Sequence, residues 1–101
     1  MRAAALGMVL SLFAAQASAQ YAPTVTPNAP YRAGANAVVV AGTAPAPYVA
    51  ALIASDSRRR VMSLWVLYDG GWLYHLPSLP TVDGGLNQFP GPVYSAIVVL
   101  T

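Results

Sequence analysis

Residues 61–76 read VMSLWVLYDGGWLYHL, two apolar runs joined by Asp69-Gly70-Gly71. Both runs are rich in valine, leucine and aromatic side chains, a composition that favours β-strands. An Asp-Gly pair supplies the positive φ angles that a tight hairpin turn requires. The sequence therefore predicts a β-hairpin in which residues 61–68 pair with residues 72–76.

Three more apolar runs, bounded by glycine, proline and polar turn residues, occupy residues 37–41, 48–54 and 93–101. Their length and composition predict strands. The run at 48–54 suits a short helix equally well, because two prolines precede it and its middle is rich in alanine. We therefore expect a mainly β domain of about five short strands, as an antiparallel meander or a small barrel or sandwich. The alternative is an α+β domain with a short helix near 47–54.

The N-terminus has the three parts of a secretory signal peptide. A single arginine, Arg2, precedes an uncharged apolar stretch, and small residues stand just before Gln20. We expect residues 1–19 to be removed between Ala19 and Gln20. The chain contains no cysteine for lipid attachment and no twin arginine, so we expect the general secretory route and a secreted protein, periplasmic or extracellular, of a bacterial cell.

Cleavage of 19 residues from the 101-residue chain would leave 82, enough for one small domain. Within it, residues 20–34 carry three closely spaced prolines and predict an extended or disordered arm. Residues 35–101 then form the β-rich domain.

The composition is apolar and almost free of charge, with 56% hydrophobic and 8% charged residues. So few basic residues argue against nucleic acid as a partner. Several predicted strands are apolar at every position, which requires cover on both faces of a sheet, and a domain of this size barely provides that cover. We expect self-association, an envelope component or a membrane surface to supply the rest, and no transmembrane helix in the mature chain.

Residues for catalysis or metal binding are few. His75 is the only histidine, and its two candidate carboxylate partners, Asp69 and Asp83, stand in Asp-Gly-Gly turns where aspartate has a sufficient structural role. With one histidine, no glutamate and no cysteine, a single chain lacks the ligands of a zinc or copper site. The sequence predicts no enzyme, no cofactor and no metal.

Four aromatic residues, Trp65, Tyr68, Trp72 and Tyr74, cluster around the predicted hairpin. On one face they would form a platform that stacks on sugar rings or peptides. The composition favours the core for the two tryptophans and partial exposure for the two tyrosines.

Arg58, Arg59 and Arg60 form the only basic run. The sequence favours a solvated loop that protects an edge strand, and the alternative is contact with an anionic surface.

Taken together, these features predict a small, exported, non-enzymatic protein that associates with the envelope or with itself. The alternative is a carbohydrate- or peptide-binding module that uses the Trp/Tyr hairpin. A third hypothesis is a small hydrolase that depends on His75.

Overall fold

The computed structural model describes residues 21–27, 30–79 and 81–101. The expected signal peptide at 1–19, and its cleavage between Ala19 and Gln20, lie outside the described residues. The elements are β1 (Thr24–Pro27), β2 (Gly34–Ala41), α2 (Ala46–Ser57), β3 (Val61–Tyr68), β4 (Gly71–His75) and β5 (Val93–Leu100).

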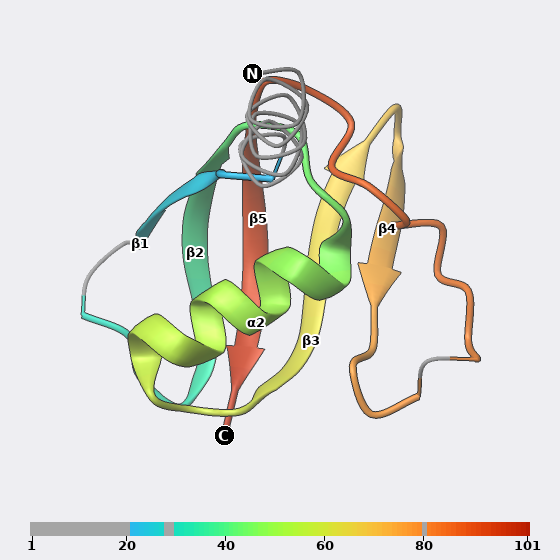
Figure 1. Cartoon of the computed structure of the whole chain (residues 1–101). Helices are drawn as coiled ribbons and strands as arrows, with labels where there is room; N and C mark the ends of the chain where they lie inside the picture. Colours follow the sequence, from blue (N-terminus) through green and yellow to red (C-terminus); the bar gives the residue numbers. More distant parts are fainter. Residues whose placement is uncertain (1–20, 28–29, 80) are drawn as a thin grey trace, which may run out of the picture.

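The strands form one open antiparallel sheet in the order β1-β2-β5-β3-β4 (Figure 1). The last strand, β5, lies between β2 and β3, so the chain passes from β2 through α2 to β3 in a right-handed crossover. The mainly β prediction is confirmed. The sheet is open rather than closed into a barrel or doubled into a sandwich, and the insertion of β5 departs from a meander.

The hairpin between β3 and β4 forms where the sequence predicts it. Tyr68 pairs with Gly71 across a two-residue loop, in which Asp69 and Gly70 have φ angles of 51° and 78°. Positive φ at both positions is typical of the type I′ turn, whose twist matches that of the flanking strands. The Asp-Gly pair is therefore sufficient to explain the register of the hairpin.

The prediction of a strand at 48–54 is wrong, and the alternative helix is correct. Helix α2 begins at Ala46, tolerates Pro47 in its first turn, and ends at Ser57; Arg58, which follows, has a left-handed φ of 56°. Its buried residues follow helical spacing and are Ala46, Val49, Ala50 and Ile53. In the part of the chain that the structure describes, no helix is long and apolar enough to cross a membrane.

Part of the proline-rich segment belongs to the sheet. Thr24–Pro27 forms β1 and pairs with β2 from Thr24↔Ala41 to Pro27↔Val38. Pro23 is buried, and its Cα lies 3.2 Å from where a Cβ on Gly42 would stand. Four residues of the segment, Thr24–Pro27, thus form an edge strand, a position in a sheet where proline is tolerated.

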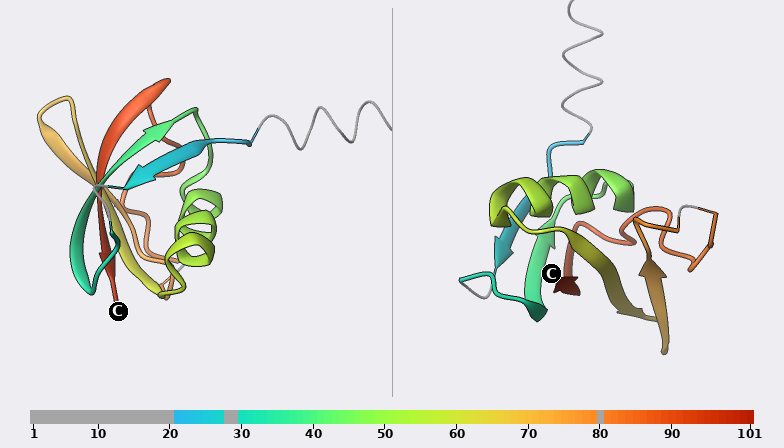
Figure 2. Two further views of the ribbon diagram at one scale, coloured as in Figure 1. Left: turned by 90° about the vertical axis from the view of Figure 1, so that its left-hand side faces the viewer. Right: turned by 90° about the horizontal axis from the view of Figure 1, so that it is seen from below.

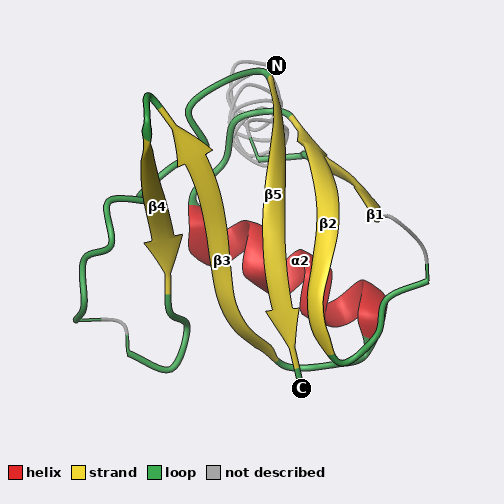
Figure 3. Cartoon of the chain, turned by 180° about the vertical axis from the view of Figure 1, so that it is seen from behind, coloured by secondary structure: helices red, strands yellow, loops and turns green. Residues whose placement is uncertain are grey.

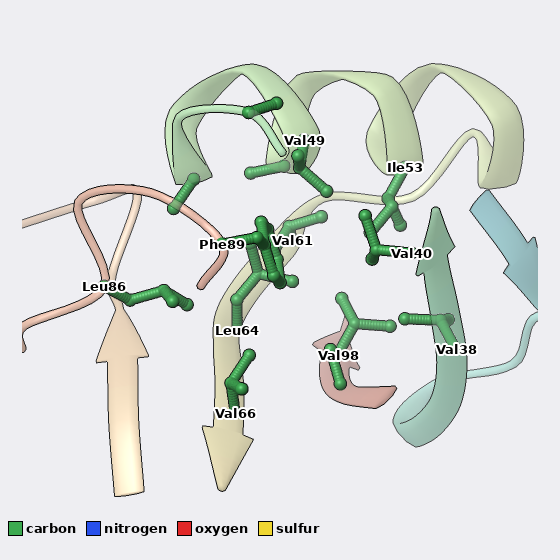
Figure 4. Packing of buried hydrophobic residues seen from close by; sticks show 14 of the residues in the cluster. Val38, Val40, Val49, Ile53, Val61, Leu64, Val66, Leu86, Phe89 and Val98 are labelled. Carbon is green, nitrogen blue, oxygen red and sulfur yellow. The ribbon is translucent and has the colours of Figure 1, made fainter. Parts of the chain in front are cut away.

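The core lies between α2 and the sheet face beneath it (Figure 4). A single helix about 10–12 Å wide cannot cover five strands spaced about 4.8 Å apart. The segment between β4 and β5 covers the remainder, burying Leu86 and Phe89. Phe89 is fixed there by its N–H, which donates to the Ala44 carbonyl at 3.1 Å.

Candidate functional site

The sheet has one covered face and one uncovered face. α2 lies on a single side (Figure 2), and the view from behind shows the strands with no described segment in front of them (Figure 3). Side chains alternate between the faces, and the register assigns residues to each. We call the uncovered side the open face; its residues are Thr24, Thr26, Ala35, Ala37, Val39, Ala41, Ser63, Trp65, Leu67, Trp72, Tyr74, Val93, Ser95, Ile97 and Val99.

The open face contains no charged side chain and several large apolar ones. Leu67 is 56% exposed, Trp72 52% and Ile97 38%, and Val39 and Val93 are exposed beside them. Single exposed apolar residues are ordinary on protein surfaces, whereas a contiguous group of them marks an interaction site. This face is therefore the candidate functional site.

The aromatic residues of the open face are ordered by contacts with one another. The rings of Trp65 and Tyr74 are 5.1 Å apart and inclined by 32°, and Trp65 Nε1–H donates to Ser63 Oγ at 2.8 Å. A shallow hollow of about 280 Å³ lies between Trp65, Trp72 and Ile97. Because Ser63 already accepts the indole N–H, the floor of this hollow presents mainly apolar surface.

The structure brings together three of the four aromatic residues that the sequence singled out. Trp65, Trp72 and Tyr74 share the open face, whereas Tyr68 points to the other side and packs on Tyr94, with ring centroids 5.8 Å apart. The expectation that the tryptophans belong to the core is wrong. The register of the hairpin turns them toward the face that α2 does not cover.

His75 lies on the covered side at the end of β4, and burial lowers the pKa of its imidazole from the usual 6.5. Asp83 lines a hollow with His75, but its Oδ1 accepts the Gly85 N–H at 2.8 Å, a turn-forming role. Asp69 stands in the hairpin turn, at the opposite end of β4. Across the described ranges, no group of three His, Asp or Glu side chains could hold a metal ion.

Arg58, Arg59 and Arg60 are exposed between α2 and β3, away from the aromatic group. Arg59 Nη1 donates to the Thr101 carbonyl at 2.8 Å, and the Arg60 N–H donates to Thr101 Oγ1 at 3.2 Å. The loop is thus tied to the end of β5, and Arg60 also lines two hollows, one of which lies beside α2.

Sequence reasoning missed the aliphatic part of the open face. Val39, Leu67 and Ile97 each sit in an uninterrupted apolar run, so local alternation gives no sign of which side is free. Strand pairing would have identified them, because Ile97 pairs with both Ala37 and Trp65.

Comparisons with protein-family models, with curated proteins and with solved structures gave no match.

Proposed function

We propose that the chain is a small exported, non-enzymatic protein that associates with a second copy of itself through the open face. The observation that carries this proposal is the concentration of exposed Leu67, Trp72 and Ile97 on an uncharged sheet face. An uncharged surface brings no like-charge repulsion when two copies meet, and burying apolar area drives association. The signal-like sequence at 1–19 supports export to the periplasm or beyond.

The shape of the open face supports pairing with itself. Its central cross-strand row runs Ala37, Ile97, Trp65, Tyr74, from small side chains on β2 to large ones on β4. Two copies can stack with their open faces together, related by a two-fold axis that runs between the sheets and parallel to β5. This axis would place Trp65 of one copy over Ala37 of the other. Ile97 would then meet its own counterpart at the axis, as an isologous interface requires.

The size of the face predicts how tight this association is. From strand spacing and rise, the face covers roughly 500 Å². A stable interface uses about 800 Å² on each partner, and smaller ones are weak or transient. We therefore expect a concentration-dependent dimer with a dissociation constant in the micromolar range or weaker.

The test is sedimentation velocity on residues 20–101 from about 1 to 500 µM, a range that brackets such a constant. Leu67→Asp and Val39→Asp should each shift the dimer to monomer, because each buries a carboxylate in the interface. Leu79→Asp is the matched control, since Leu79 is 52% exposed and lies in the loop after β4, outside the open face. Circular dichroism shows whether each variant keeps its fold.

A mixing experiment tests the two-fold arrangement. Val39 lies two residues after Ala37 on β2, and Leu67 lies two residues after Trp65 on β3, so the two positions are on opposite sides of β5. Equimolar Leu67→Asp and Val39→Lys should restore a mixed dimer, because each charge faces the other across the axis. A chain that stays monomeric at the highest concentration, or a Leu79→Asp variant that dissociates as readily as Leu67→Asp, contradicts the proposal.

The second candidate function is binding of a carbohydrate or peptide on the same aromatic group. The hollow between Trp65, Trp72 and Ile97 favours it, since sugar rings stack on exposed indoles. The engaged Trp65 N–H argues against it, because sugar hydroxyls need hydrogen-bond partners and the three residues that line the hollow offer few. Glycan-array binding by the monomeric Leu67→Asp variant that is lost on Trp72→Ala would favour this second function.

A further inference from the structure

A groove lies near the end of β4, beside α2 and the start of β3. It consists of three adjoining hollows of about 310, 260 and 320 Å³ that share lining residues. His75 and Pro47 line the first and second hollows, whereas Arg60, Val61 and Pro77 line the first and the third. The first hollow therefore lies between the other two, and we call the three together the groove.

The groove exists because two different elements cover this side of the sheet. α2 packs over β3 and the centre of the sheet, while Leu86 and Phe89 of the following loop cover the region near β4. His75 lies at the end of β4, and the second hollow brings it together with Pro47 of α2 and Leu86 of the loop. The small side chains of Ala50, Ala51 and Ala54 leave space that larger residues would fill.

The walls of the central hollow are apolar, apart from two nitrogen-bearing side chains. The apolar lining residues are Pro47, Ala50, Ala51, Ala54, Val61 and Pro77. Arg60 adds a permanent positive charge at one end. Burial lowers the pKa of the His75 imidazole, which favours its neutral form, a group that can both donate and accept a hydrogen bond.

The charge is polarised along the groove. Arg60 lines the first and third hollows, whereas Asp83 lines the second hollow, on the other side of His75. An anionic group is therefore attracted to the Arg60 end and repelled from the other. A hydrocarbon chain suits the alanine-lined wall between them.

We propose that this groove binds a free alkyl carboxylate, with the carboxylate at Arg60 and the chain along the small residues of α2. The central hollow is near the lower limit of the roughly 300–1,000 Å³ that small-ligand sites occupy, so one short chain fits. A hollow that one short chain fills suits a single molecule taken from solution. The site lies on the opposite side of the sheet from the open face, so it does not depend on the proposed self-association.

The test is isothermal titration of residues 20–101 with octanoate, octanol and octylammonium. We expect octanoate to bind about fivefold more tightly than octanol, because Arg60 pairs with its carboxylate in a partly exposed setting. Octylammonium, with the opposite charge, should bind more weakly than octanol. Anionic phosphatidylglycerol vesicles should not retain the protein in a sedimentation assay.

Two variants and a matched control locate the site. Arg60→Gln should reduce octanoate affinity to that of octanol, and Ala51→Phe should abolish binding by filling the hollow from an exposed helix position. Arg58→Gln removes the same charge from the same loop, at a residue that lines none of the three hollows, and should leave affinity unchanged. The imidazole signals of His75, the only histidine, should shift with octanoate in the wild type and not in Ala51→Phe.

The proposal is overturned by an absence of octanoate binding, by equal binding of octylammonium, or by unchanged affinity in Ala51→Phe with the fold intact by circular dichroism. Octanoate binding that disappears in Leu67→Asp would place the ligand on the open face and would also overturn it. Retained binding by the monomeric Leu67→Asp variant supports the groove whatever the oligomeric state.

Discussion

Val38 and Val39 are adjacent on β2 and have the same side chain, yet Val38 is fully buried under α2 while Val39 is 41% exposed on the open face. The same contrast recurs on β5, where Val98 is buried and Ile97 is not. Both faces are apolar, but the described segments cover only one of them. Burial in this protein is therefore decided by the layer above each residue rather than by the residue itself.

The largest expected difference between the faces is in stability. Phe89 is fully buried in the core between the sheet and the segments that cover it. Phe89→Ala leaves a cavity there and should lower the free energy of unfolding by about 3–5 kcal/mol. Ile97→Ala on the open face should cost about 1 kcal/mol or less. Urea denaturation at low protein concentration, where the open face is unpaired, measures both. Equal losses would mean that the open face is covered within one chain.

The second prediction concerns the loop that completes the covered face. A Cβ on Gly84 would collide with the Tyr74 carbonyl oxygen and ring, so Gly84→Ala should cost about 1–3 kcal/mol. The loss should appear as faster amide exchange in the loop that carries Leu86. Gly71→Ala is the control, because a Cβ there meets nothing closer than 4.0 Å. If both substitutions are neutral, the loop does not depend on its close approach to β4.

The third prediction tests how the open face is ordered without cover. Ser63→Ala removes the acceptor of the Trp65 N–H and should cost about 1 kcal/mol, with faster exchange of the indole proton by NMR. Ser95→Ala, at an exposed position of the same face, should change neither stability nor exchange. An unchanged indole exchange rate in Ser63→Ala would show that packing on Tyr74 alone fixes the ring.

The smallest expected effect is the pH dependence that His75 contributes at the margin of the covered face. Its folded pKa lies below the unfolded value of 6.5, so the unfolded state binds more protons between those values. Stability therefore falls as the pH drops from about 7 through 6.5 toward the lower folded value. Thermal unfolding of wild type and His75→Gln at several pH values should show this slope only in the wild type.

Much of the fold follows from local sequence. Asp69-Gly70 between two β-forming runs is enough to predict the hairpin, because the turn chemistry is contained in those two residues. The run at 48–54 shows the limit of such reasoning, since its alanine-rich composition suits both a helix and a short buried strand. The need for a layer over Val38, Val98 and their neighbours selects the helix.

The sequence alone identifies the aromatic residues of the candidate site but not its aliphatic ones. The aromatic residues attract notice by their type, but their orientation depends on strand register, which turns Trp65, Trp72 and Tyr74 to one side and Tyr68 to the other. The aliphatic residues of the open face come from runs that are apolar on both sides. The groove at His75 is lined by residues of α2, β3 and β4, which are distant in the chain, so no local sequence pattern predicts it.

The sequence by itself determined the strand-forming runs, the hairpin turn and the scarcity of charge, because each depends on residues close together in the chain. Only the tertiary structure decided that β5 enters the middle of the sheet, that Thr24–Pro27 becomes an edge strand, and that one apolar face is left open. The physical reason is that pairing between distant strands, and the placing of a single helix over one side, are properties of the whole packed chain.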